Sequence, residues 1–393
     1  MSGHAAPSAE ELLERAHELV PFLQSKALWA EDNRRPHDEV VEALAGAGMY
    51  DLRRPARYGG YESAYHTMVD VFGVLAAGDG SIAWNAGVWA TGGWLAAQFP
   101  DYVQDEIFAR PAVRICAALS PTAEAAVVPG GLRVSGQWRF MSGARHSHWQ
   151  VIIAMAPAPG GGQWPVAGLV PMNELEIVDD WDSSGLAGTG SVTTIARDVL
   201  VPDDRVLPMP VLLEGQGASE VNAAAPVFRT PMMPTGAAGL IGVAVGMAKA
   251  TRDQFFERLP SRKIAYTAYA SQAAAPVTHL QAAEAALKID EAEFHAHRMA
   301  DLLDDKGVSG MPWKTEERVR NRGWLGRVVQ QSREAVEILS TASGGSSVYR
   351  SVPIQRIQRD MRALTMHGLM YPAANFEVYG RGLCGLEPDT AYL

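Results

Sequence analysis

Two short stretches of this sequence carry side chains that could take part in chemistry. The first is the run from Trp138 to Gly143, which places an aromatic ring, a hydroxyl and a small residue close together. Alternate side chains of an extended strand share a face, so Trp138, Phe140 and Ser142 are expected on one side. An ordinary half-buried strand gives the same pattern, and for this stretch alone it is the better interpretation.

The second stretch contains His367, which follows the pair Arg359 and Asp360. An imidazole can hold or deliver a proton near neutral pH, so a histidine in a cleft suits acid–base work. A helix starting at Pro353 would bury the stripe Ile354, Ile357, Met361 and Leu364. His367 falls beside that stripe and can reach a cleft. The alternative, about equally good from this residue alone, is a boundary histidine capping the helix before Gly368.

Two pairs of neighbouring histidines do not predict a metal site. His146 and His148 can share a strand face, but no carboxylate or cysteine lies at a supporting spacing. His295 and His297 point in roughly opposite directions on a helix and cannot chelate one ion together. No metal is therefore predicted, and His146 is instead a candidate for the edge of a substrate pocket.

A helix from Ser81 to Phe99 is the next candidate for lining a site. Trp84, Asn85, Val88 and Trp89 share one of its faces. Core packing is the more frequent explanation for such tryptophans. Asn85 is informative because a buried amide needs a hydrogen-bond partner. We therefore treat Asn85 and Trp89 as candidate substrate-binding residues.

The elements that position these residues fall into three parts, which we expect to be domains: residues 1–112, 113–212 and 213–393. The first part has helical periodicity, for example at Leu12, Ala16, Leu19 and Leu23. The second alternates short β-favouring runs with Gly and Pro turns, among them 113–117, 132–140, 149–154, 166–171 and 192–201, and 157–162 is expected at a hairpin tip. The third predicts a bundle of long helices at 231–249, 265–299, 315–341 and 353–366. The fold class is α+β.

Composition excludes several classes of function. The chain has 393 residues and a net charge of -10 without a basic run, which argues against nucleic acid and anionic membranes as partners. Cys116 and Cys384 form no pair or zinc spacing, so a reduced cytoplasmic protein is the default. We see no secretory signal and no apolar stretch of membrane-spanning length. The glycines of 236–246 are better explained by close helix packing than by dinucleotide binding.

Four segments in this order resemble the acyl-CoA dehydrogenase superfamily over nearly the whole chain. They are Gly48–Pro55 with Tyr58, Gly59 and Gly60; Leu132–Gly143; Trp181–Gly185 with Gly188–Ser191, Val201 and Pro202; and Gly344, Gly345, Tyr349, Pro353, Arg356, Arg359 and Asp360. One such segment would be a weak signal, but four in the family's order are a strong one. The resemblance implies an N-terminal helical domain, a middle β-domain, a C-terminal helical bundle and a bound flavin.

The residues after the Arg-Asp pair distinguish two branches of this superfamily. Many dehydrogenases place a glutamate base there, because the proton they remove is weakly acidic. Here His367 stands near that location, and no glutamate follows until Glu377. This is similar to the two-component flavin-dependent monooxygenases. The resemblance implies a flavin C4a-hydroperoxide that hydroxylates a bulky aromatic or heteroaromatic substrate. Alternatives are an acyl-CoA dehydrogenase-like FAD enzyme, an N- or S-oxygenase, or a flavin-free binding protein.

The resemblance also implies roles for individual residues. Ser142 and His367 would lie beside the flavin and act in catalysis, with Ser142 slowing the loss of hydrogen peroxide. Flavin-binding residues would be Trp138, Phe140, Ser142, Gly188, Thr189, Ser191, Arg262 and Thr267. Arg262 and Thr267 depart from the usual family pattern and would serve a neighbouring subunit's flavin. Reduced FMN or FAD would come from a separate NAD(P)H-dependent reductase, O2 would be the co-substrate, and the assembly would be a homotetramer.

Overall fold

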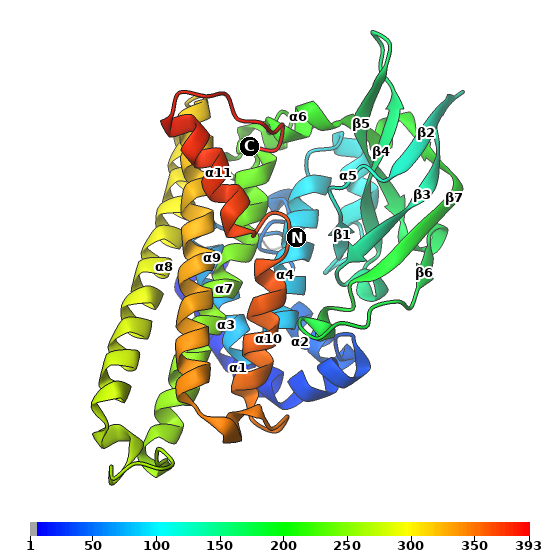
Figure 1. The fold of residues 1–393 in the computed structure, drawn as a ribbon. Coiled ribbons are helices and arrows are strands. Elements are labelled where there is room, and N and C mark those ends of the chain that lie inside the picture. The colour runs from blue at the N-terminus through cyan, green and yellow to red at the C-terminus, as the bar shows by residue number, and fades with distance from the viewer. Residues whose placement is uncertain (1–5) are drawn as a thin grey trace.

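The computed structural model describes residues 6–393 and shows helices before and after one block of strands (Figure 1). The helices before the strands are α1 (Ala9–Asn33), α2 (Asp38–Gly46), α3 (Tyr65–Gly78), α4 (Gly80–Ala96) and α5 (Asp101–Phe108). Those after them are α6 (Met209–Leu213), α7 (Met232–Arg258), α8 (Pro276–Ser309), α9 (Thr315–Ala342), α10 (Pro353–Thr365) and α11 (Pro372–Leu383). The predicted α+β order is confirmed.

The strands form one mixed sheet of eight strands. They are β1 (Ile115–Ala117), β2 (Ala123–Val128), β3 (Gly131–Met141), β4 (Trp149–Pro157), β5 (Gln163–Pro171), β6 (Glu176–Val178), β7 (Val192–Pro202) and β8 (Val206–Pro208). The order is β6-β7-β3-β2-β4-β5-β8, and β1 also pairs with β4. Pro157 pairs with Gln163, so the predicted hairpin tip at 157–162 is confirmed. The sheet lies beside the helical bundle (Figure 1).

Helix α7 lies in the interior, against α3 and α4. A Cβ added at Gly242 would lie 2.1 Å from the carbonyl oxygen of Val69, and one at Gly246 would lie 2.0 Å from that of Gly73. The interpretation of these glycines as close packing is thus confirmed. Among the described residues, Met232–Ser261 is the one helical span long and apolar enough to cross a membrane, so the expectation that no apolar stretch reaches that length is wrong. However, 94% of its most apolar window is buried inside the protein. It is a core helix.

The start of α8 differs from the prediction. Residues from Ala265 onward were expected to be helical, whereas α8 begins at Pro276. Before it lie two short 3-10 turns, Leu259–Ser261 and Gln272–Ala274, joined by a loop. Proline favours the first turn of a helix, and Tyr266 in this loop has a left-handed φ of 60° that interrupts helical geometry. The expected helices 231–249, 315–341 and 353–366 are confirmed by α7, α9 and α10.

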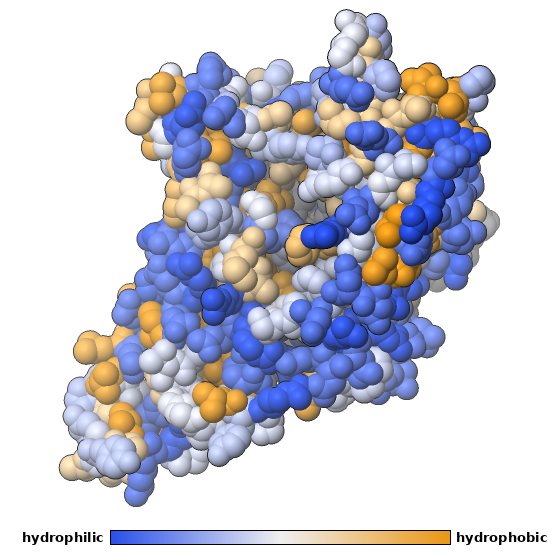
Figure 2. Space-filling model, turned by 45° about the vertical axis from the view of Figure 1, so that its right-hand side comes forward, coloured by the Kyte–Doolittle hydropathy of each residue, from blue (hydrophilic) through white to orange (hydrophobic). Residues whose placement is uncertain are grey.

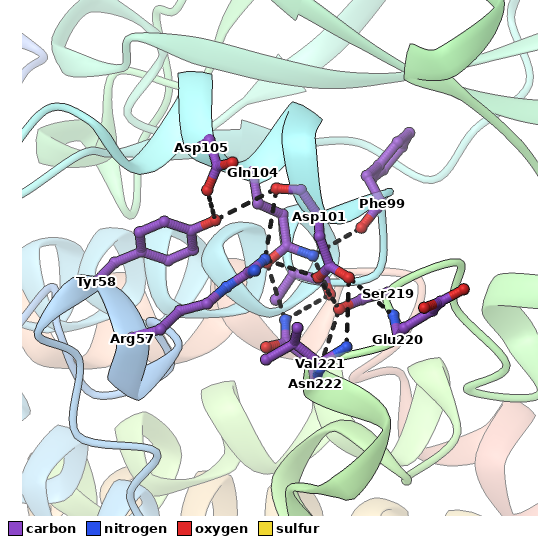
Figure 3. A network of polar contacts seen from close by, with 11 residues as sticks. Arg57, Tyr58, Phe99, Asp101, Gln104, Asp105, Ser219, Glu220, Val221 and Asn222 are labelled. Carbon is purple, nitrogen blue, oxygen red and sulfur yellow. Dashed lines mark hydrogen bonds and ion pairs between the residues drawn. The ribbon is translucent and has the colours of Figure 1, made fainter.

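A network of hydrogen bonds connects the start of α5 to the segment that follows α6 (Figure 3). The Asp101 carboxylate accepts hydrogen bonds from Arg57 at 2.7 Å and from the Ser219 hydroxyl at 2.6 Å. The Asn222 amide donates to the Gln104 side chain at 2.9 Å. Ser219 and Asn222 also line a cavity of about 400 Å³, which is separate from the cleft described next.

Candidate active site

Ser142 follows the end of β3 and takes part in a row of hydroxyl groups. The Trp84 indole Nε1 donates to its oxygen at 3.1 Å. The Ser191 hydroxyl oxygen lies 2.7 Å away, and the Thr189 hydroxyl lies 2.6 Å beyond that. Thr189 donates to the carbonyl of Leu186 at 2.7 Å. The structure therefore brings together three of the residues predicted from the sequence.

The direction of these hydrogen bonds follows from counting protons, because each hydroxyl has only one to give. Thr189 gives its proton to the Leu186 carbonyl, so Ser191 must donate to Thr189. Ser142 must then donate to Ser191. The Ser142 oxygen has two lone pairs, and the Trp84 N–H occupies one of them. One lone pair therefore remains. Ser142 is thus set to accept a hydrogen bond from an N–H group, not to donate one.

Trp84 links this row to the predicted histidine. Its ring meets the His367 ring edge to face, with the centroids 5.0 Å apart. Trp84 is held by α4, whose first turn is capped by the Asp79 carboxylate, which accepts from the Ser81 N–H at 2.7 Å and the Ile82 N–H at 3.2 Å. A fixed helix start and a buried ring place Trp84 between Ser142 and His367.

His367 lies just after the C-terminus of α10, whose predicted stripe is buried as expected. Its ring is exposed, yet desolvation by the surrounding protein lowers its pKa to about 4. The His367 side chain is therefore accessible to solvent although protein atoms surround most of its imidazole. Its Nδ1 accepts from the Leu369 N–H at 3.3 Å, so in the neutral ring the proton is on Nε2. His367 therefore offers a neutral N–H donor.

A buried carboxylate on α10 holds the loop that carries the hydroxyl row. The Asp360 side chain accepts from the Leu186 N–H at 2.5 Å. Desolvation, with the nearby charge of Asp79, raises the pKa of Asp360 to about 7. Asp360 therefore connects α10 to the 181–191 loop, and Asp79, which caps α4, lies close enough to influence its charge. The sequence analysis used Asp360 only as part of a motif and missed this positioning role.

The expected common face of Trp138, Phe140 and Ser142 is wrong. Trp138 is 1% exposed inside the β-sheet core, where its indole N–H donates to the Ile153 carbonyl at 2.9 Å. Phe140 is 68% exposed. The cause is an irregularity in the β3–β7 pairing between Trp138 and Met141, with Phe140 at a left-handed φ of 63°. This structure gives Trp138 no surface for a ligand.

Phe140 instead faces another aromatic ring. Its ring meets that of Trp181 edge to face, with the centroids 6.1 Å apart. Backbone strain of this kind at a non-glycine residue is concentrated at functional sites. Trp181 also donates from its indole to the Ala187 carbonyl at 3.1 Å, which braces the loop carrying Thr189 and Ser191. Trp181 was recognised in the sequence only as part of a motif.

Two other predicted residues support the loop from behind. A Cβ at Gly188 would lie 3.1 Å from Ala30 and from Ser81, so this glycine lets the loop approach α1 and α4. The Asn85 amide donates to the Thr189 carbonyl at 3.1 Å and is fully buried, which supplies the partner that the sequence required. Its amide oxygen is buried without a partner. Asn85 contacts the loop, and its proposed contact with a substrate stays a prediction.

Trp89 and His146 make hydrogen bonds to other parts of the protein. Trp89 is 2% exposed, and its indole donates to the Ser147 hydroxyl at 2.9 Å. His146 Nε2 lies 2.8 Å from the Asp38 carboxylate on α2. Burial lowers the pKa of His146, although the hydrogen bond to Asp38 acts in the opposite direction. The structure engages both side chains in contacts within the protein.

Arg262 and Thr267 lie in the connection between α7 and α8, at the far end of the helical bundle from the sheet (Figure 1). The Thr267 hydroxyl donates to the Ile264 carbonyl at 2.8 Å. One Arg262 guanidinium nitrogen is buried without a partner. A single chain therefore does not bring these two residues to Ser142.

The side chains of the cleft fit a reduced flavin. Such a group needs hydrogen-bond partners along its edge and an apolar surface against its ring. Ser142 supplies an acceptor for an N–H, which a reduced flavin carries on its central ring. The exposed Phe140 ring supplies apolar surface. Ser142 and Phe140 would hold the group, while Thr189 and Ser191 act through the orientation of Ser142.

The chain is similar to flavin-dependent oxygenases over its whole length. Residues 238–372 match the family model described as acyl-CoA dehydrogenase, C-terminal domain. The chain is 30% identical to the oxygenase component of an FADH2-dependent resorcinol hydroxylase from a Rhizobium species, covering 97% of this chain and 96% of that protein. It is also 30% identical to the oxygenase subunit HsaA, a flavin-dependent monooxygenase of Mycobacterium tuberculosis, covering 97% and 98%.

Solved structures agree with this relationship. XiaF from a Streptomyces species, in complex with FADH2 and glycerol, superposes with a TM-score of 0.93 at 29% identity and 98% coverage of both chains. The HsaA structure from Mycobacterium tuberculosis superposes with a TM-score of 0.92 at 28% identity, covering 98% of this chain and 100% of that one.

Proposed function

The chain belongs to the family of flavin-dependent monooxygenase oxygenase components with the acyl-CoA dehydrogenase fold, and we propose that it hydroxylates a bulky aromatic or heteroaromatic compound. Reduced FMN or FAD, when bound, would supply the electrons with which one atom of O2 is transferred to the substrate and the other is released as water. The observation that carries the proposal is that Ser142 and His367 both contact the Trp84 side chain.

Ser142 orients the bound flavin in this proposal. Its proton is committed to Ser191, so its free lone pair accepts the flavin N–H. The flavin N–H proton would leave less readily when Ser142 accepts it in a hydrogen bond. The wasteful release of hydrogen peroxide would therefore be slower. Ser142 is 7% exposed, and exclusion of water strengthens this hydrogen bond.

His367 orients the substrate. A neutral Nε2–H donates to the hydroxyl or phenolate oxygen of an aromatic compound and aims its ring at the flavin. Desolvation keeps this imidazole neutral, so the side chain acts as a hydrogen-bond donor and not as a fixed positive charge. A neutral donor of this kind would stabilise electron density on the phenolic oxygen.

The product of a labelled reaction tests the proposal. The purified chain is supplied with reduced FMN or FAD from a separate NAD(P)H-dependent reductase and with a panel of phenols, indoles and polycyclic aromatics under 18O2. We expect a product with one added 18O atom and none from water. Oxidation of acyl-CoA thioesters without incorporation of 18O would support a dehydrogenase instead. The same panel extended to amines and sulfur compounds identifies N- or S-oxygenation.

We also propose a homotetramer whose flavin sites are shared between subunits. Leu280, Leu287 and Phe294 recur every seven residues on α8 and are 72%, 69% and 57% exposed. Exposed apolar stripes of this length are uncommon on monomers. Apolar side chains also gather over the protruding end of the bundle in Figure 2. Another subunit covering this surface would bring Arg262 and Thr267 to its partner's flavin, and dihedral symmetry would repeat the arrangement.

Subunit mixing tests the shared site. Chains carrying Ser142→Ala and chains carrying Arg262→Ala are each assayed alone and after being unfolded and refolded together. If each site takes Ser142 from one subunit and Arg262 from another, a mixed assembly contains some sites with both residues intact. The yield of product per O2 consumed should therefore recover after mixing. Equal activity before and after mixing, or an active monomer by light scattering, would contradict the proposal.

Free Cys116 and Cys384 are compatible with the cytoplasmic location that we propose.

A further inference from the structure

Two histidines and an aspartate from different helices meet on the bundle, apart from the cleft. His66 and Asp70 lie one turn apart on α3, and His297 lies on α8. One nitrogen or oxygen atom from each lies within 4.8 Å of the other two. The imidazole rings of His66 and His297 stack at a centroid distance of 4.2 Å and an angle of 19°. No residue of this cluster belongs to the site proposed above.

Both imidazoles present the same nitrogen to Asp70. Nε2 of His297 is 2.7 Å from one carboxylate oxygen, and Nε2 of His66 is 3.6 Å from the other. The Nδ1 of His66 lies 2.8 Å from the carboxylate of Asp301. This carboxylate–histidine contact places the proton on Nδ1 and leaves Nε2 free as a ligand. Metal-binding histidines in proteins are oriented by the same kind of contact.

The charges around the cluster favour a cation. Asp304 accepts from the backbone N–H groups of Tyr65 at 2.8 Å and His66 at 3.1 Å, so it adds a third carboxylate beside Asp70 and Asp301. Lys249, the neighbouring cation, is paired with Glu293. The side chains of His66, Asp70 and His297 are 43%, 28% and 28% exposed, so an ion can reach them from solvent.

We propose that His66, Asp70 and His297 bind one zinc ion that links α3 to α8. Imidazole nitrogen and carboxylate oxygen ligands suit zinc, whereas magnesium and calcium prefer sites made of oxygen alone. Ligand atoms around a tetrahedral zinc are about 3.3–3.6 Å apart, given bond lengths of about 2.0–2.2 Å. The Nε2 of His297 and the Asp70 oxygen, 2.7 Å apart, would separate slightly, whereas the most distant pair, at most 4.8 Å apart, would approach by about 1 Å. Water occupies the fourth position, and the ion connects residues 227 positions apart in sequence.

Zinc titration of the full chain tests the site. The protein is treated with a chelator, dialysed and titrated with zinc chloride in a calorimeter at a pH near 7.5. We expect one saturable site per chain and a higher Tm in the presence of zinc. The His297→Ala and His66→Ala variants should each bind zinc at least tenfold more weakly and lose the rise in Tm. Asp301→Asn, which alters only the contact behind His66, should weaken binding less.

His295→Ala is the matched control, because His295 lies two residues away on α8 and is not one of the three ligands. It should bind zinc like the wild type. Cobalt provides a second readout, since tetrahedral coordination gives an intense visible absorption that His297→Ala should lose. No saturable zinc binding, equal affinity in wild type and His297→Ala, or a weak octahedral cobalt spectrum would each overturn the proposal. Far-UV circular dichroism without metal verifies that both single-histidine variants fold.

Discussion

The indole nitrogen of Trp84 lies 3.1 Å from the hydroxyl oxygen of Ser142 and donates its proton to that oxygen. The same indole ring contacts His367 edge to face. One side chain of α4 therefore occupies an acceptor position of Ser142 and packs against the histidine. A fixed arrangement of this kind costs no reorganisation when a reaction begins.

Removing the Ser142 hydroxyl should uncouple oxygen use from product formation. In Ser142→Ala the acceptor for the flavin N–H is lost, and a larger share of the O2 consumed should be released as hydrogen peroxide. One neutral hydrogen bond is worth about 0.5–1.5 kcal/mol, so the effect should be several-fold. Ser135→Ala on β3 is the control, because that hydroxyl accepts from the Asp198 N–H away from the cleft. An unchanged peroxide yield in Ser142→Ala would remove Ser142 from this role.

Replacing Trp84 with phenylalanine should have a similar effect through Ser142. Trp84→Phe keeps an aromatic ring beside His367 but removes the N–H that occupies one Ser142 lone pair, so Ser142 is no longer held in one orientation. We expect more peroxide per O2 and little further loss when Ser142→Ala is added. Trp94→Phe is the matched control, because it also removes a buried indole hydrogen bond on α4, to Val227. Fully additive effects of the Trp84 and Ser142 changes would contradict the coupling.

His367→Ala should lose most product while still folding and binding flavin. The neutral Nε2–H that orients the substrate is absent, so the Kd for reduced flavin should change little. The rate of hydroxylation should fall by about 10²-fold, the loss expected when a substrate is misplaced by about 1 Å. Flavin binding is measured by anaerobic titration and product by chromatography. Wild-type hydroxylation in the variant would exclude His367 from the reaction.

The pH dependence gives a separate test of His367. Desolvation lowers its pKa to about 4, so the folded protein keeps the ring neutral at pH values where a free histidine, with a pKa of about 6.5, is half charged. The unfolded chain binds the proton more readily between these values, so His367 destabilises the fold as pH falls through that window. The pH profile of product formation near pH 6.5 should therefore be the same in wild type and His367→Ala. An inflection present in the wild type and absent in the variant is not expected. Such an inflection would mean that the imidazole titrates normally.

Asp360→Asn should make the protein's stability less dependent on pH. Burial raises the pKa of Asp360 to about 7, so the folded state holds a proton that the unfolded state releases above about pH 4. The contribution of Asp360 to the free energy of unfolding is therefore fully present below about pH 4 and is lost as the pH rises towards 7. An asparagine stays neutral and can still accept from the Leu186 N–H. Urea unfolding at pH 5 and pH 8 should show the variant gaining relative to wild type at pH 8, and an equal difference at both pH values would contradict this.

Local patterns predicted much of the fold, because helical and strand periodicity report burial along single elements. The stripe Ile354, Ile357, Met361 and Leu364 is buried on α10, as expected. Periodicity failed where the backbone leaves regular geometry. The irregular pairing near Phe140 places Trp138 and Phe140 on different faces of β3. In the last part of the chain, the left-handed φ of Tyr266 and the proline at position 276 explain why α8 begins at Pro276 and not near Ala265. The proposed domain limits at 112 and 212 stay a prediction.

Long-range contacts were outside the reach of sequence spacing. The prediction for Ser142, Ser191 and Thr189 came from family motifs, and no spacing rule links Trp84 to Ser142, which are 58 residues apart. The sequence argument against a metal compared only histidines within one strand or one helix. It therefore had no access to a cluster in which His297 from α8 meets His66 and Asp70 from α3.

The most direct test of the proposed chemistry is rapid mixing of the enzyme and reduced flavin with O2, followed by the flavin absorbance. We predict a transient spectrum, distinct from both reduced and oxidised flavin, that persists before oxidised flavin appears and that decays several-fold faster in Ser142→Ala. A direct return to oxidised flavin in one phase, at the rate of free flavin and equal in wild type and Ser142→Ala, would contradict the account.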